Sequence, residues 1–204
     1  MTPSGIESDS ELMEQCEAAL TGGASALQYR DKNTTEEKRQ QRALRLANIC
    51  RRYSVPFIVN DSPTLAQYAG ADGVHLGRSD LNIEKAQIIM GKQKIIGMTC
   101  HNNLEFVRAA KLASATYCAL GAVFLSPTKP QSTSCPPSTI LHIKKMCPGI
   151  SIIAIGGINA NNIGQIAAAG ADAAAVISSL FNAVDIEEAA QRLCTAFGKD
   201  KNDS

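Results

Sequence analysis

The sequence lacks the features that mark membrane, secreted and nucleic-acid-binding proteins. It has no apolar run long enough to cross a membrane, and residues 1–10 are polar and unlike a secretory leader. Lys and Arg number 20 against 19 for Asp and Glu, so the formal net charge is only +1. Such a balance provides no attraction for nucleic acid or an anionic membrane. We therefore expect neither partner, and we leave the oligomeric state open, a homodimer included.

The seven cysteines lack the spacing of a zinc site. They are odd in number, scattered and never in C-x-x-C order, which also argues against a disulfide framework. Cys118 and Cys194 lie in apolar runs and are expected in the core. The pattern predicts reduced thiols and a cytoplasmic protein.

Signatures of acid–base catalysis are missing as well. The sequence shows no Ser-His-Asp order with a nucleophile elbow, no carboxylate pair of a glycosidase and no Schiff-base lysine deep in a strand. His75 falls within a predicted strand and His142 on a predicted helix, so we expect core or surface roles for both rather than catalysis. His101 lies near the end of a strand, and its role is left open.

Strands and helices alternate regularly along the chain. A helix over 8–20, with Ser10 as its cap, precedes seven strand–helix units. This alternation, with apolar strands, predicts a parallel sheet covered by helices on both faces. The predicted strands are 26–32 (a strand and its turn), 56–59, 73–76, 94–98, 117–124, 152–155 and 173–177, and the helices after them are 35–53, 63–68, 83–90, 104–113, 138–147, 161–169 and 185–197.

Polar residues follow nearly every predicted strand at its C-terminal end. This distribution favours a (β/α)8 TIM barrel, which builds its site from all strand ends, over an open sheet with one switch point. The 204 residues fit one catalytic domain over 1–204, with 198–204 as a frayed tail.

Gln28, Arg30 and Lys32 form the first polar group. Because side chains alternate along a strand, these three share one face, and Leu27, Tyr29 and Asp31 share the other. An amide and two cations are costly to bury without anionic partners. We interpret them as an anion site, and the alternative is a solvated edge strand.

Asn60, Asp61 and Asp80 end two neighbouring strands. Each alone is more typical of a helix cap. Together they offer hard oxygen ligands without a competing His or Cys cluster, which suits Mg²⁺ held also by phosphates of a substrate.

Two later segments predict further anion sites. Lys129 lies in a loop stiffened by prolines, Ser126-Pro127-Thr128-Lys129-Pro130. Gly156-Gly157 and Ile177-Ser178 follow the last two strands, where such barrels commonly bind phosphate. Cations, Mg²⁺ ligands and two separate anion sites suit displacement of pyrophosphate by a second, phosphorylated substrate.

Six motifs taken together resemble the thiamine-phosphate synthase family, from the first helix to about Phe197. They are Gln28-x-Arg30-x-Lys32, Val59-Asn60-Asp61, Gly73-Val74-His75-Leu76-Gly77, Ser126-Pro127-Thr128-Lys129-Pro130, Ile155-Gly156-Gly157-Ile158 and Val176-Ile177-Ser178. The resemblance implies a transferase that joins 4-amino-2-methyl-5-hydroxymethylpyrimidine diphosphate to 4-methyl-5-(2-phosphoethyl)thiazole. The products would be thiamine monophosphate and pyrophosphate.

The resemblance also implies a role for each site residue. Gln28, Arg30, Lys32, Asn60, Thr99 and Lys129 would hold the pyrimidine diphosphate, Asp61 and Asp80 would bind Mg²⁺, and Ser126, Pro127, Thr128, Gly157, Ile177 and Ser178 would hold the thiazole phosphate. Arg30, Lys32 and Lys129 would stabilise the charge on pyrophosphate as it dissociates, so no general base is required.

The chain departs from the family pattern in two places. Thr99 stands where serine is expected, which keeps the hydroxyl. The apolar first strand is largely missing, because the chain opens at Met1-Thr2-Pro3. We therefore expect an irregular patch between residues 27–29 and 174–177, and a longer N-terminus in the fully stable and active protein.

Two alternatives stay open. A thiazole tautomerase of the same family would carry a histidine at the place that Ala122 takes here. A phosphate-binding barrel without catalysis would fit the missing strand, but the complete set of ligand residues argues against it.

Overall fold

The computed structural model describes residues 1–3, 5–77, 82–124 and 133–202. Helices and strands alternate along it, as the sequence predicts. The order is α1 (Asp9–Thr21), β1 (Leu27–Tyr29), α2 (Glu36–Arg52), β2 (Phe57–Asn60), α3 (Pro63–Tyr68), β3 (Gly73–Leu76), α4 (Ile83–Met90), β4 (Ile95–His101), α5 (Leu104–Leu112), β5 (Tyr117–Leu120), α6 (Pro137–Met146), β6 (Ser151–Ile155), α7 (Ile163–Ala168), β7 (Ala173–Ala175), α8 (Ser178–Phe181) and α9 (Ile186–Asn202).

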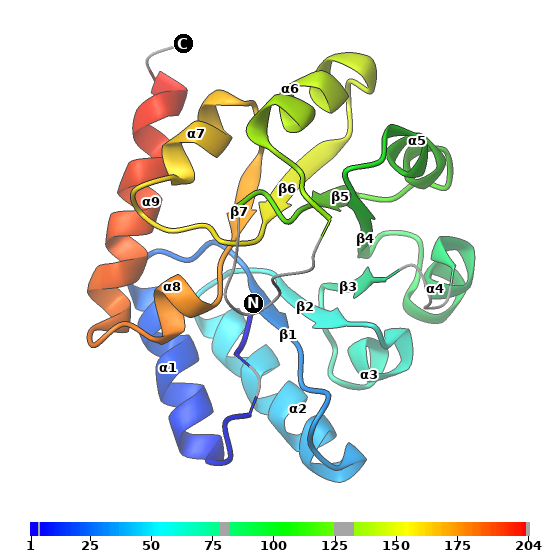
Figure 1. Cartoon of the computed structure of the whole chain (residues 1–204). Helices are drawn as coiled ribbons and strands as arrows, with labels where there is room; N and C mark the ends of the chain where they lie inside the picture. Colours follow the sequence, from blue (N-terminus) through cyan, green and yellow to red (C-terminus); the bar gives the residue numbers. More distant parts are fainter. Residues whose placement is uncertain (4, 78–81, 125–132, 203–204) are drawn as a thin grey trace.

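The described strands form one parallel sheet in the order β1-β2-β3-β4-β5-β6-β7. The sheet curls around the centre of the molecule, and the helices lie outside it (Figure 1). This is the barrel-like α/β arrangement in which the C-terminal strand ends share one mouth. Among the described helices, none is long and apolar enough to span a bilayer.

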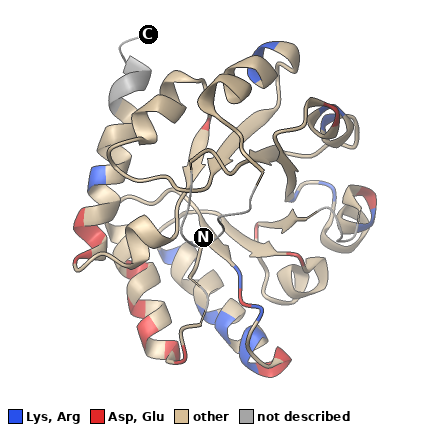
Figure 2. Ribbon diagram, viewed as in Figure 1, with Lys and Arg blue, Asp and Glu red and all other residues tan. Residues whose placement is uncertain are grey.

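The first two helices begin with ordinary side-chain caps. The side chain of Ser8, rather than the predicted Ser10, accepts a hydrogen bond at the start of α1, and Thr35 does the same for α2. Helix α2 begins with acidic and ends with basic residues, which complements its dipole. Figure 2 shows that basic residues gather on this helix.

Met1 and Thr2 lie between the two edges of the sheet. The Thr2 amide donates to the Gln28 carbonyl at 2.8 Å, and the Met1 amino group donates to the Val176 carbonyl at 3.2 Å. The Thr2 hydroxyl also bonds the backbone of Arg30, as acceptor from its amide and donor to its carbonyl. This short segment therefore satisfies backbone groups at both edges.

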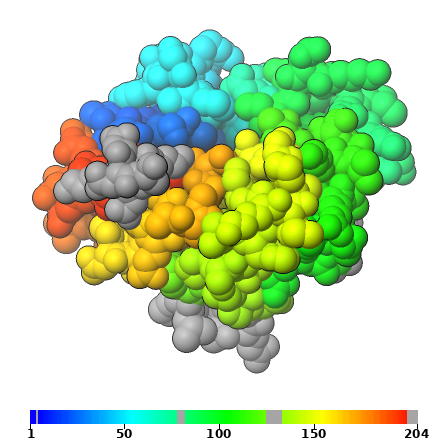
Figure 3. Space-filling view, turned by 90° about the horizontal axis from the view of Figure 1, so that it is seen from above, coloured from blue at the N-terminus to red at the C-terminus, as the bar shows by residue number. Residues whose placement is uncertain are grey.

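The first and last helices pack together on the outside of the barrel. Helix α1 packs on α9, where a side chain on Gly22 would overlap with Glu187 and Ala190. In Figure 3 the blue N-terminal segment lies beside the orange and red of α9.

The structure corrects several details of the sequence prediction, including β4, which runs to His101 rather than 98, and β7, which ends at Ala175 rather than 177. β5 ends at Leu120, before the predicted residue 124, because the Ala122 amide bonds the Thr133 carbonyl, which lies outside the sheet. Helix α8 was not predicted, and α9 continues to Asn202, beyond the predicted end at Phe197. Cys194 is exposed on α9 rather than in the core, whereas the adjacent Leu193 is buried.

Candidate active site

Two polar pairs join the ends of β1 and β2. Gln28 Nε2 donates to Asn60 Oδ1 at 2.6 Å, and Lys32 Nζ lies 2.8 Å from Asp61 Oδ2. The parallel register of β1 and β2 places these residues at the same mouth. The structure therefore brings together four of the predicted site residues, from two segments.

Asp61 is held in an unusual backbone conformation. Its φ is +65°, a left-handed value that is uncommon outside glycine, and its amide donates to the His75 carbonyl at 2.8 Å. The bond fixes the turn after β2 to the next strand. Its carboxylate is half-buried and paired with Lys32, as expected for an acidic group placed to meet cations.

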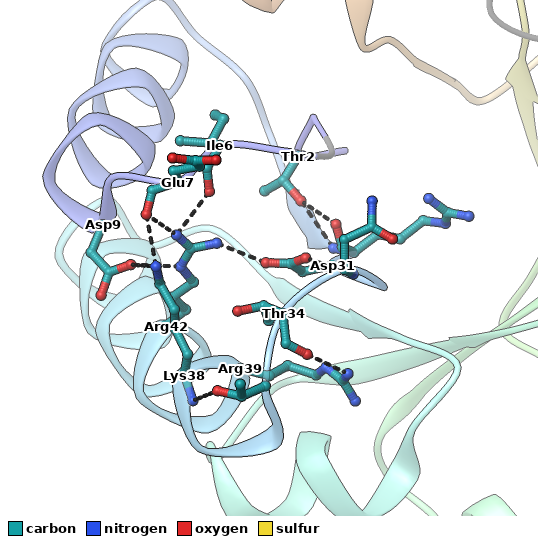
Figure 4. A network of polar contacts seen from close by, with 12 residues as sticks. Thr2, Ile6, Glu7, Asp9, Asp31, Thr34, Lys38, Arg39 and Arg42 are labelled. Atoms are coloured by element: carbon teal, nitrogen blue, oxygen red, sulfur yellow. Dashed lines mark hydrogen bonds and ion pairs between the residues drawn. The ribbon is translucent and has the colours of Figure 1, made fainter.

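Asp31, between Arg30 and Lys32, points to the opposite side and binds a buried arginine. Arg42 of α2 is 2% exposed, and its Nη1 donates to Asp31 Oδ2 at 2.7 Å (Figure 4). Its Nε donates to Asp9 at 2.7 Å, and its Nη2 donates to the carbonyls of Ile6 and Glu7. These hydrogen bonds hold the segment after β1 on the side opposite to Arg30 and Lys32.

The Arg42 network was not predicted, although the sequence carries a signal for it. Arg42 falls in line with the buried residues Leu46 and Cys50 at helical spacing, so it occupies the apolar stripe of α2. A buried arginine requires carboxylate partners. The hydrogen bond from Arg42 lowers the pKa of Asp9 below its ordinary value.

A second buried network crosses β3, β4 and β5. His75 Nε2 lies 2.8 Å from Thr99 Oγ1, and His75 Nδ1 lies 2.9 Å from Tyr117 Oη. Burial lowers the pKa of His75 to about 4, and the nearby Asp61 opposes the shift only in part. Of the core and surface roles expected for His75, the structure shows a core position, and the residue also contacts Thr99 of the predicted site.

The loops after β6 and β7 form the opposite side of the mouth. Gly156 and Gly157 both have positive φ, +105° and +63°. A side chain on Gly156 would lie 2.6 Å from Ala122 Cβ, so this close approach requires glycine. Asn162 Nδ2 holds the Gly157 carbonyl at 2.9 Å, and α8 begins at Ser178, directly after Ile177.

Several predicted site residues lie outside the described residues. They are Asp80, Ser126, Pro127, Thr128 and Lys129. His101 is exposed at the end of β4, and His142 is exposed on α6. In the described part of the chain, no group of three or more His, Cys, Asp or Glu could hold a metal ion. The described hard oxygen donors at the predicted metal position are Asn60 and Asp61.

Comparisons with known proteins show the family of the chain. A family model described as thiamine monophosphate synthase matches residues 1–180. Thiamine-phosphate synthase of Thiobacillus denitrificans is 44% identical over 189 residues, which cover 93% of this chain and 89% of that relative. The enzyme of the same description from Chromobacterium violaceum is 46% identical over 198 residues, covering 97% and 94%.

Solved structures resemble the chain over almost its whole length. The thiamine phosphate pyrophosphorylase of Pyrococcus furiosus has a TM-score of 0.86 at 30% identity and covers 98% of this chain and 95% of its own. Orotidine 5'-phosphate decarboxylase of Pyrococcus horikoshii has a TM-score of 0.71 at 16% identity, with 97% and 99% covered, and shares the fold alone.

Proposed function

This chain belongs to the thiamine monophosphate synthase family and is a thiamine-phosphate synthase, a transferase of thiamine biosynthesis; on that premise, we propose which substrates and residues act at its barrel mouth. The substrates would be 4-amino-2-methyl-5-hydroxymethylpyrimidine diphosphate and 4-methyl-5-(2-phosphoethyl)thiazole. The observation that carries the proposal is the meeting of Gln28 with Asn60 and of Lys32 with Asp61 at one mouth.

The pyrimidine diphosphate would lie over the ends of β1, β2 and β4. Gln28 and Asn60 offer amide groups for the aminopyrimidine, and the Thr99 hydroxyl lies on the neighbouring wall. Arg30 and Lys32 would bind the diphosphate from the segment that Arg42 anchors. Lys129, outside the described residues, would complete the set.

Asp61 and Asp80 would hold Mg²⁺. The donor chemistry fits, because Asp61 is a half-buried carboxylate whose neighbour in the structure is already a cation, Lys32. Bound Mg²⁺ would neutralise charge on the diphosphate. Asp80 lies outside the described residues, so its part rests on the sequence and the family resemblance.

The thiazole phosphate would bind across the mouth. Gly157, Ile177 and Ser178 belong to the two loops that follow β6 and β7, where positive φ at Gly157 exposes backbone groups. Ser126, Pro127 and Thr128 would approach from the loop after β5. A phosphate fixed there would orient the thiazole nitrogen toward the pyrimidine methylene carbon.

The residues support dissociative loss of pyrophosphate. The electron-rich aminopyrimidine tolerates positive charge once pyrophosphate leaves, so the main task is to stabilise the leaving group. Arg30, Lys32 and Lys129 would supply that stabilisation at a mouth partly shielded from water. The thiazole nitrogen carries no proton to remove, and no base is needed.

The chain would work as one catalytic domain over residues 1–204 in the cytoplasm. The free cysteines, six of them buried, support a reducing compartment. Met1 and Thr2 would stand in the place of the first strand of a (β/α)8 barrel, which their hydrogen bonds to Gln28 and Val176 support.

The proposal is tested by assaying thiamine monophosphate and pyrophosphate from the two substrates. Activity should require Mg²⁺ and disappear with EDTA. Lys129→Ala should lower kcat about 100-fold, the scale of one preorganised charge donor. Lys92→Ala, an exposed lysine before β4 at the far end of the sheet, is the matched control. Near-normal turnover of Lys129→Ala would remove Lys129 from the mechanism.

A further inference from the structure

His75, Gly97 and Tyr117 stand side by side on three neighbouring strands. The register pairs His75 with Gly97 and Gly97 with Tyr117. Because Gly97 has no side chain, the Tyr117 side chain crosses β4 and meets His75, and a Cβ at position 97 would overlap with the Tyr117 ring. The two rings stack with centroids 5.5 Å apart and planes at 20°.

Thr99 lies two residues beyond Gly97 on β4, toward the mouth. Strand geometry places Gly97 and Thr99 on the same face. His75 therefore reaches Tyr117 with Nδ1, at 2.9 Å, and Thr99 with Nε2, at 2.8 Å. Both ring nitrogens of His75, which is only 8% exposed, therefore take part in hydrogen bonds.

The Tyr117 hydroxyl proton decides which nitrogen carries the histidine proton. A buried phenol must donate its proton, and in the described part of the chain His75 Nδ1 is the acceptor within reach of Tyr117 Oη. Nδ1 can accept only when it is unprotonated. A neutral His75 then carries its proton on Nε2 and donates it to Thr99 Oγ1.

This arrangement leaves the Thr99 hydroxyl proton without an acceptor in the part of the chain that the structure describes. The Thr99 oxygen accepts from His75, and among the described residues no acceptor bonds the Thr99 hydroxyl proton. If Nδ1 were protonated instead, Nε2 would accept a hydrogen bond from the Thr99 hydroxyl. The Tyr117 hydroxyl proton would then be buried without an acceptor among the described residues.

We propose that Tyr117 and His75 are positioning residues that orient Thr99 as a hydrogen-bond donor to an acceptor atom of the pyrimidine diphosphate. This inference rests on the proposed function, in which Thr99 binds that substrate. The acceptor is a ring nitrogen or a phosphate oxygen, both of which carry lone pairs and no proton. Neither Tyr117 nor His75 touches the substrate in this arrangement.

The first test reads the histidine tautomer directly. In protein with ¹⁵N-labelled histidine, the His75 signals, assigned by their loss in His75→Gln, should show a neutral ring protonated at Nε2. Tyr117→Phe keeps the ring packing and removes the proton donor, so it should shift His75 toward the Nδ1-protonated form. A wild-type His75 protonated at Nδ1, or at both nitrogens at neutral pH, overturns the proposal.

The second test is a double-mutant cycle on binding, measured by calorimetry without turnover. Thr99→Val should weaken the pyrimidine diphosphate about tenfold, the scale of one hydrogen bond, and Thr99→Ser should restore it. Tyr117→Phe should weaken it about threefold in the wild-type background and have no effect when Thr99→Val is already present. An equal loss in both backgrounds overturns the proposal, because Tyr117 would then act without Thr99.

Two probes show which substrate atom accepts the hydrogen bond from Thr99. The same variant also distinguishes failure of the proposed function from failure of the positioning proposal. Weaker binding of inorganic pyrophosphate to Thr99→Val assigns the bond to a phosphate oxygen, and weaker binding of 4-amino-2-methyl-5-hydroxymethylpyrimidine assigns it to the ring. If Thr99→Val binds the diphosphate normally, the assigned role of Thr99 in the proposed function is wrong, even with the Nε2 tautomer present. If Thr99→Val weakens binding but His75 is protonated at Nδ1, only the positioning inference fails.

Discussion

Lys32 and Asp61 form an ion pair across the ends of two strands, with Lys32 Nζ 2.8 Å from Asp61 Oδ2. Lys32 is proposed to bind the diphosphate, and Asp61 is proposed to bind Mg²⁺. The same carboxylate could not serve both cations fully, so under this proposal the affinity of Asp61 for the metal would depend on Lys32.

Lys32→Met should therefore raise the affinity for Mg²⁺ alone while it lowers kcat. A half-exposed ion pair contributes up to about 1 kcal/mol, so the Mg²⁺ dissociation constant should fall by up to about fivefold. Calorimetric titration with Mg²⁺ in the absence of substrates measures this. Lys145→Met on α6 is the control and should change neither value. Weaker Mg²⁺ binding in Lys32→Met would show that Lys32 does not compete for Asp61.

Ser178→Asp should separate the two anion sites. A carboxylate at the start of α8 would repel the thiazole phosphate, and we expect its KM to rise about tenfold, which corresponds to about 1.4 kcal/mol. The KM of the pyrimidine diphosphate should stay unchanged. Steady-state kinetics with each substrate varied in turn gives both values, with Ser178→Ala as the uncharged control. Equal weakening of both substrates would mean that the sites are merged or misplaced.

Arg42→Met should destabilise the fold through the carboxylates it leaves behind. The Asp31 side chain is 8% exposed, and a buried charge without its partner costs about 3 kcal/mol of unfolding free energy. Adding Asp31→Asn should recover part of that loss, because the uncompensated charge is removed. Urea unfolding measures each variant, and the exposed Arg51→Met should change the free energy by less than about 0.5 kcal/mol. A double variant no more stable than Arg42→Met would contradict this account.

The stability of the protein should fall between pH 6.5 and pH 4 because of His75. Its pKa is lowered to about 4 in the folded state from an ordinary value of 6.5, so in this window the unfolded chain binds a proton that the folded chain does not. One such proton changes the unfolding free energy by about 1.4 kcal/mol per pH unit. His75→Gln should show a flatter dependence in urea unfolding at several pH values, whereas the exposed His142→Gln should not. Identical slopes for wild type and His75→Gln would rule out the burial effect.

The sequence predicted the elements whose pattern is local. The seven strand–helix units follow from apolar strands, capping residues and helical spacing, and α4 runs over the predicted residues 83–90. Alternation along residues 27–32 correctly separated Gln28 and Lys32, which meet Asn60 and Asp61, from Asp31, which meets Arg42. Helix α8 was not predicted, because its four residues are too few to show a helical spacing of apolar residues.

Contacts across strands could not be predicted in the same way. Pairing His75 with Tyr117 requires the register of three strands and the absence of a side chain at Gly97, and neither property is visible in one segment alone. Arg42 was missed because a charged residue on a charged helix suggests solvent, while its burial depends on Asp9 and Asp31 arriving from other segments. The roles of Asp80 and Lys129 rest on the sequence and the family resemblance, since both lie outside the described residues.

The space that Gly97 leaves for Tyr117 has a consequence for sequence variation. A larger residue at position 97 would fill the volume that the tyrosine ring occupies, so the two positions cannot vary independently. Among related sequences, we expect a ring at position 117 to occur with glycine at 97, and a side chain at 97 to occur with a small residue at 117. His75, which bonds Tyr117, should then vary together with positions 97 and 117.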